Sequence, residues 1–255
     1  MISSQTLSTI SLLVYSLWAF RTFAAKNHVG RIINSAFEDT FSGSTLNTGN
    51  WIVSNYSAAD YAGGGTTVTF SPNNLNTKYG MLQMVMQQPT ATTSTGAEIQ
   101  SVRTFGYGTY EFKMRMGTTS PTPTGSGNGA SGSISAGFSW INDSQTEIDV
   151  EQAGAIPYRV DFTSWDGLCC STERDVNERA NLSEGFHDYR YVWTQGELKF
   201  YFDGILQATM TANVPSTPAY IFLNFYGINM PVWGSPATVG VTRYQYVSYV
   251  SYTPL

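Results

Sequence analysis

Short runs of alternating apolar and polar residues, separated by Gly, Pro, Asn or Asp, recur along most of the chain and restrict the folds open to it. Residues 110 to 116 read Tyr-Glu-Phe-Lys-Met-Arg-Met, so one strand face would carry the aromatic and Met side chains and the other the charged ones, Arg115 included. We expect strands over residues 66–70, 81–87, 97–102, 108–116, 133–140, 147–151, 158–163, 187–195, 198–202, 220–226 and 240–252. This spacing is typical of a β-sandwich or barrel.

The composition agrees with a secreted β-rich protein. Charged residues make up only 12% of the 255 residues, whereas Tyr, Phe and Trp number 16, 14 and 6. Such a composition argues against a disordered, coiled-coil or helical chain. The formal net charge is −5 and no run of Lys or Arg occurs, so we expect no nucleic-acid partner.

The first 25 residues are predicted to be a secretory signal peptide. The apolar run from Ile10 to Phe20 is too short to span a bilayer and is followed by small residues at Ala24 and Ala25. An uncleaved membrane anchor and a buried element of the fold are the alternatives. We therefore expect one domain over residues 26–255, secreted as a monomer without stable membrane association after cleavage.

Two features concern covalent chemistry outside any catalytic site. Cys169 and Cys170 are adjacent, and their Cα atoms, about 3.8 Å apart, lie closer than in ordinary disulfides. Two thiols without a role and a labile disulfide both stay open. Sequons begin at Asn55, Asn142 and Asn181 and could carry glycans in a eukaryotic secretory host.

Residues 120–135, rich in Ser, Gly, Pro and Thr, form the one low-complexity segment. Because strand-like runs continue on both sides, we interpret it as a long loop and not as a domain linker. The loop either lacks a function or borders a binding site.

The stretch 146–152 spaces three acids two residues apart, with apolar residues between them. In a strand, Glu147, Asp149 and Glu151 would share one face. Like charges in a row raise carboxyl pKa values, which can keep one acid protonated beside an ionised neighbour. Glycoside hydrolysis needs such a pair, one group to attack or activate water and one to give a proton. A divalent-metal site and a merely solvated acidic strand are the alternatives.

The separation of Glu147 and Glu151 along the strand limits the interpretation of these acids as a catalytic pair. A retaining glycosidase holds its two carboxyl groups about 5 to 5.5 Å apart, whereas four residues of flat strand separate the Cα atoms of Glu147 and Glu151 by about 13 Å. The triplet therefore needs a bent strand on a concave sheet, so that the outer two side chains lean together.

The pentapeptide from Glu147 to Glu151, Glu-Ile-Asp-Val-Glu, resembles the ExDxE motif of glycoside hydrolase family 16 in its regular-strand variant. The resemblance to bacterial lichenases of this family runs in order from about Phe41 to Tyr252. Further similar segments are residues 96–101, 105–112, 186–189 with Trp193, 202–204 and 212–218. The resemblance implies an all-β, concanavalin A-like β-jelly-roll sandwich with a concave substrate cleft.

The resemblance also implies a role for each acid. Glu147 would be the nucleophile, Asp149 the assisting residue and Glu151 the general acid/base of a double displacement with net retention. The substrate-binding positions it implies are Glu98, Gln100, Phe138, Trp140, Asn224 and Tyr226. No cofactor is expected, and no metal, because Gln245 stands where lichenases carry an Asp that helps to bind calcium.

Departures from the lichenase pattern lie on both flanks of the triplet. Thr146 replaces an Asp and Gln152 replaces a Phe, and there we expect the substrate preference to diverge. Trp165, Asp166 and Trp233 are expected in loops, either contacting sugar or covering the core edge. His187 is interpreted as structural, since its neighbour Asp188 would point to the opposite strand face.

The sequence therefore predicts a secreted retaining endo-β-glucanase acting on β-1,3-1,4-glucan of the lichenan type, a licheninase, or on a related β-glucan. A transglycosylase of the same family and a β-1,3-glucanase or other polysaccharide hydrolase are alternative enzymes. A non-catalytic carbohydrate-binding protein is the alternative of another class, which loss of one carboxylate would favour.

Overall fold

A computed structural model describes residues 35–63, 65–141, 146–167, 171–231 and 233–255. Over these residues the chain forms 17 β-strands and two short 3-10 turns, Tyr61–Gly63 and Pro72–Asn74. No helix of the described part has the length and apolar character that crossing a membrane requires. The predicted signal peptide, the cysteine pair and the sequon Asn142 lie outside the described residues.

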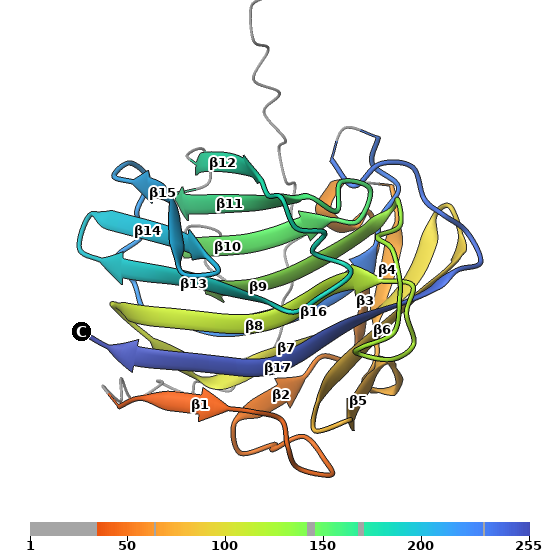
Figure 1. The fold of residues 1–255 in the computed structure, drawn as a ribbon, viewed down its shortest axis with the longest axis horizontal. Helices are drawn as coiled ribbons and strands as arrows, with labels where there is room; N and C mark the ends of the chain where they lie inside the picture. Colours follow the sequence, from red (N-terminus) through yellow and green to blue (C-terminus); the bar gives the residue numbers. More distant parts are fainter. Residues whose placement is uncertain (1–34, 64, 142–145, 168–170, 232) are drawn as a thin grey trace, which may run out of the picture.

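Seven antiparallel strands form the layer that we call sheet B, in the order β12–β11–β10–β9–β16–β7–β2 (Figure 1). Along the central strands, side chains alternate between an inner face and a second face, which carries acids on β10 and mainly apolar and aromatic side chains on β9 and β16. The bounds are β12 (Ser171–Asn177), β11 (Arg159–Asp166), β10 (Thr146–Ala153), β9 (Ser133–Ile141), β16 (Ala219–Gly227), β7 (Thr93–Phe105) and β2 (Trp51–Val53).

The second layer, sheet A, has the antiparallel order β15–β14–β13–β8–β17–β6–β5. In addition, β1 pairs with the end of β17, β3 pairs with β4, and β4 runs parallel to the start of β7. The bounds are β15 (Ile205–Met210), β14 (Glu197–Phe202), β13 (His187–Thr194), β8 (Gly108–Thr118), β17 (Thr242–Pro254), β6 (Met81–Thr90), β5 (Leu75–Lys78), β1 (Phe37–Asp39), β3 (Tyr56–Ala58) and β4 (Thr67–Phe70).

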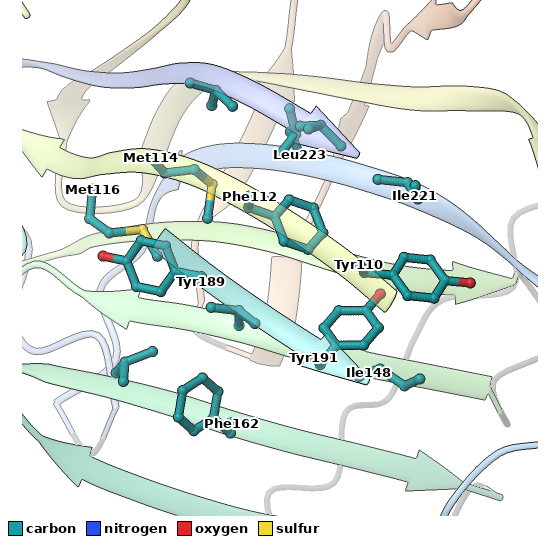
Figure 2. Close-up of a cluster of buried hydrophobic side chains, with 14 of the residues drawn as sticks. Tyr110, Phe112, Met114, Met116, Ile148, Phe162, Tyr189, Tyr191, Ile221 and Leu223 are labelled. Carbon is teal, nitrogen blue, oxygen red and sulfur yellow. The ribbon is translucent and has the colours of Figure 1, made fainter. Parts of the chain in front are cut away.

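The core lies between the inner faces of the two sheets, and Figure 2 shows part of it. Sheet A contributes large aromatic and Met side chains, and sheet B contributes branched aliphatic side chains together with aromatic ones such as Phe162. Each fully buried side chain of this kind stabilises the fold by about 1.5–3 kcal/mol. The labelled residues are Tyr110, Phe112, Met114, Met116, Tyr189 and Tyr191 of sheet A with Ile148, Phe162, Ile221 and Leu223 of sheet B. The predicted jelly-roll sandwich is therefore confirmed.

All the predicted strands are present, with bounds that differ by up to four residues. The sequence missed short edge strands and two longer ones, β12 and β15. β12 was missed because its sequence, Ser-Thr-Glu-Arg-Asp-Val-Asn, is mostly polar and lies exposed at the edge of sheet B. The interpretation of residues 165 and 166 as loop was wrong, because pairing with β10 extends β11 through Asp166.

The prediction that Arg115 points to solvent was also wrong. Arg115 is fully buried, and its guanidinium donates to the carbonyls of Ser183, Thr122 and Pro123 at 2.8, 3.2 and 3.0 Å and to the Thr118 hydroxyl at 3.1 Å. Two of these carbonyls belong to the low-complexity segment. A buried cation therefore holds this loop to sheet A, in place of backbone pairing.

We predict that Arg115→Met lowers the free energy of unfolding by about 3 kcal/mol, because several buried carbonyls lose their donor. Lys113→Met is the control on the same strand. Within the part of the chain that the structure describes, the Lys113 side chain makes a solvent-exposed ion pair with Asp188 at 3.3 Å, so its loss should change stability by no more than about 0.5 kcal/mol. Urea unfolding of both variants tests this, and equal small losses would contradict the anchoring role of Arg115.

Candidate active site

Strand register brings the predicted site residues onto one face of sheet B. Glu147, Asp149 and Glu151 are the Cα partners of Trp140, Phe138 and Ala136 on β9. On the next strand, β16, Asn224 lies opposite Ala136 and Phe222 lies opposite Phe138. On the strand after that, β7, Glu98 lies opposite Asn224 and Gln100 lies opposite Phe222. Directly paired residues point to the same side of an antiparallel sheet. We call this side, defined by the residues just named, the acidic face.

The three acids of β10 differ in burial. Asp149, in the middle, is 4% exposed, while Glu147 and Glu151 are partly buried. Burial raises the pKa of Asp149 well above its usual range, and the charges of Glu147 and Glu151 and a hydrogen bond with Glu147 raise it further. Burial also raises the pKa of Glu151, helped by Glu147, Asp161 and Glu173. Two carboxyl groups of the triplet therefore tend to keep their protons.

Trp165 of β11 completes the surroundings of the triplet. It is the Cα partner of Glu147, and its Nε1 donates to Oδ2 of Asp149 at 3.2 Å. This bond lowers the pKa of Asp149, against the larger effect of burial. Asp149 is thus held from two sides, by Glu147 on its own strand and by Trp165 on the next.

On β7, Glu98 is nearly buried and accepts two hydrogen bonds on Oε1, from Ser54 Oγ at 2.7 Å and Tyr56 Oη at 2.8 Å. Asn224, the cross-strand partner of Glu98, is 4% exposed. The Oδ1 atom of Asn224 has no hydrogen-bond partner among the described residues. Ser54 directly follows β2, and Tyr56 is the first residue of β3. These two hydroxyl groups therefore fix the orientation of one predicted substrate-binding carboxylate.

Aromatic side chains line the part of the acidic face next to Glu147. Phe138 and Phe222 stack with ring centroids 5.1 Å apart, and Trp140 meets Phe222 edge-on at 5.5 Å. Tyr220, the cross-strand partner of Trp140, packs against the same cluster. An aromatic surface beside carboxylates is the chemistry that binds sugar rings.

Tyr226 lies differently from the aromatic residues beside Glu147. Its ring is 3% exposed and meets Tyr61 edge-on at 4.8 Å and Phe70 at 6.1 Å. Little ring surface is left for stacking on a sugar. Burial raises the pKa of Tyr226, and the charge of Glu151 raises it further, so its hydroxyl stays protonated beside the acids.

Three further residues singled out in the sequence lie away from the acidic face. Thr146 and Gln152 have the inward orientation of Ile148 and Val150, and Gln152 Nε2 donates to Ser183 Oγ at 3.3 Å. They therefore cannot contact a substrate that lies over the acids. His187 belongs to sheet A, where Nδ1 bonds Asp203 Oδ2 at 2.8 Å.

Gln245, also in sheet A, is fully buried with Nε2 3.7 Å from Met114 Sδ. Among the described residues, no group of three His, Cys, Asp or Glu side chains is arranged to hold a metal ion. The acidic face thus has carboxyl groups with raised pKa values, those of Asp149 and Glu151, beside an aromatic surface, which suits acid/base and nucleophilic chemistry on a sugar.

A family model described as glycosyl hydrolases family 16 matches residues 63–245, well over half of the chain. The chain belongs to glycoside hydrolase family 16. A β-glucanase of Paenibacillus macerans is 29% identical over 77% of this chain and 81% of its own length. A β-glucanase of Bacillus subtilis is 25% identical over 97% and 98%. The solved β-glucanase of Bacillus licheniformis superimposes with a TM-score of 0.74, 26% identity and coverage of 87% and 99%.

The sequence missed several residues of this family 16 site. Asp161 and Arg159 of β11 and the aromatic pair Tyr220 and Phe222 lie on the acidic face, and Trp165 was left undecided. The alternation Arg-Val-Asp-Phe-Thr-Ser-Trp over residues 159–165 contained the signal, since every second residue is polar or amphipathic and shares the face of the triplet.

The raised carboxyl pKa values of the acidic face predict that stability falls as pH rises. Between about pH 4, near the unfolded values, and pH 7, folded Asp149, Glu151 and Asp161 bind more protons than the unfolded chain does. The unfolding midpoint should therefore fall over this range. Asp149→Asn, which keeps the shape without the charge, should reduce the fall and raise the midpoint at pH 7.

Thermal unfolding of the wild type and of Asp149→Asn at pH 4.5, 5.5 and 7 measures this effect. Asp166→Asn, on an exposed residue of β11, is the control and should follow the wild type. A wild-type midpoint that rises with pH, or the same slope in Asp149→Asn, would contradict the assigned cause.

Proposed function

We propose that this family 16 enzyme is a retaining endo-β-glucanase, with β-1,3-1,4-glucan as its first candidate substrate. The observation that carries the proposal is the row of three acids on one strand of sheet B, of which the central one is buried and the outer two are partly accessible. The similarity to the β-glucanases named above supports the substrate class.

In the proposed reaction, Glu147 is the nucleophile and attacks the anomeric carbon, while protonated Glu151 gives its proton to the departing glycosidic oxygen. The bond from the anomeric carbon to Glu147 replaces the glycosidic bond. Glu151, now ionised, then takes a proton from water, which displaces Glu147 and releases the sugar with its original anomeric configuration. The raised pKa of Glu151 suits the first step.

Asp149 is the proposed assisting residue. Its raised pKa keeps it protonated, so that it can donate a hydrogen bond to the Glu147 carboxylate. Trp165, which donates to Oδ2 of Asp149, restricts the orientation of the Asp149 carboxyl group. The nucleophile is thereby oriented and its negative charge is spread before substrate binds.

The proposed substrate contacts come from both sides of the triplet. Aromatic rings of Phe138 and Trp140 would face sugar rings, and Glu98, Gln100 and Asn224 would bind sugar hydroxyls. For Asn224, the unpartnered and buried Oδ1 supports the assignment, because a sugar hydroxyl would satisfy it. Tyr226 would contribute its hydroxyl more than its ring face.

We further propose that the protein acts outside the cell as a monomer, after removal of residues 1–25. The apolar run between Ile10 and Phe20 supports secretion. Its partner is then a polysaccharide, and neither nucleic acid nor a membrane.

The roles of the two glutamates can be separated with azide. Glu147→Ala should reduce turnover of lichenan to background, and added azide should yield an α-glycosyl azide, because azide enters from the face that the nucleophile left empty. Glu151→Ala should reduce turnover about 10²- to 10⁴-fold. With an activated aryl glycoside as substrate it should yield the β-glycosyl azide, because azide replaces water on the covalent intermediate.

If Glu147→Ala instead yields the β-glycosyl azide and Glu151→Ala the α-glycosyl azide, then Glu151 is the nucleophile and Glu147 the general acid/base. Gln152→Ala, on the same strand but directed toward the core, is a control that should keep the wild-type stereochemistry of products.

Wild-type digests of lichenan, barley β-glucan and laminarin define the linkage. No new reducing ends from any of the three would refute a β-glucanase.

A further inference from the structure

A second charged group lies beside Glu151, on strands β11 and β12. Asp161 is the Cα partner of Glu151 across the β10–β11 pair, and Asp175 is the partner of Asp161 across the β11–β12 pair. Residues opposed in this way have Cβ atoms about 4.5–5.5 Å apart and point to the same face. Asp161 is 2% exposed. Its charge is therefore poorly screened by water and acts strongly on its neighbour.

Arg159 holds this buried carboxyl group. The guanidinium places Nε 2.6 Å from Oδ1 of Asp161, and Nη2 donates to Oδ2 at 3.0 Å. Nη1 lies 3.1 Å from Oδ2 of Asp175. Burial raises the pKa of Asp161 to about 6, and Arg159 keeps it from rising further. At neutral pH Asp161 is therefore mostly ionised, although it is buried.

Glu151 is surrounded by acids on three strands. Its cross-strand partner on β9 is the uncharged Ala136, so the charges come from elsewhere. The titratable groups that act on it or respond to it are Glu147 and Asp149 on β10, Asp161 on β11, Glu173 on β12 and Tyr226 on β16. Of these, Asp161 is the direct cross-strand neighbour, and the catalytic steps proposed above do not use it.

We infer that Asp161, held by Arg159, is a positioning residue that keeps the catalytic proton on Glu151. The inference rests on the proposed role of Glu151 as general acid. A fixed negative charge beside Glu151 opposes its ionisation, so the acid stays protonated to higher pH. Arg159 has the complementary task, because without this cation Asp161 would compete for the same proton.

The test is the pH dependence of kcat/KM for lichenan in the wild type, Asp161→Asn and Asp175→Asn. The alkaline limb of this profile reports the acid that must be protonated in the free enzyme. Asp161→Asn should move that limb to lower pH by about one unit, which corresponds to a roughly tenfold loss at the alkaline end. Asp175→Asn also removes a carboxylate partner of Arg159, but not one opposite Glu151, so its limb should stay in place.

A second substrate separates this effect from damage to the fold. A dinitrophenyl β-glycoside loses its leaving group without a proton, so Asp161→Asn should keep wild-type kcat/KM on it across the alkaline limb. An unmoved limb in Asp161→Asn, an equal shift in Asp175→Asn, or equal losses on both substrates would overturn the inference. A wild type that cleaves no β-glucan at any pH would instead refute the proposed function.

Discussion

The antiparallel pairing of β10 with β9 on one side and β11 on the other is the constraint on which the rest of the site depends. It fixes which residues of three strands share a face, and a shift of one residue would turn the acids into the core. The inward side chains Ile148 and Val150 are fully buried and hold this register. The core packing of β10 therefore also determines where its three acids lie.

The same pairing explains why the three carboxyl groups of β10 have different surroundings. Asp149 lies between two glutamates and accepts a hydrogen bond from the Trp165 indole, and burial together with the two neighbouring charges raises its pKa. Glu151 has a carboxyl group, Asp161, opposite it, whereas the cross-strand partners of Glu147 are Trp140 and Trp165. A surface of carboxyl groups on one side and of indole rings on the other distinguishes the proposed acid from the proposed nucleophile.

Much of this could be predicted from the sequence, because alternation with period two identifies both the strands and the shared face of the triplet. Long-range pairing could not be predicted. Arg115 has the alternation of an exposed residue, yet it is buried because carbonyls of a distant loop approach it. Asp161 looked unremarkable until pairing placed it opposite Glu151, and the mostly polar sequence of β12 gave no strand signal.

The proposed mechanism requires that Glu147 forms a covalent bond to the sugar during turnover. The most direct measurement is to incubate the protein with a 2-deoxy-2-fluoro β-glycoside of a glucan oligosaccharide bearing a good leaving group, and to map the label by mass spectrometry of peptides. We expect one added glycosyl group per chain, attached to Glu147 within the strand Thr146–Ala153. A label on Glu151, or turnover of glucan with inverted products and no label, would contradict it.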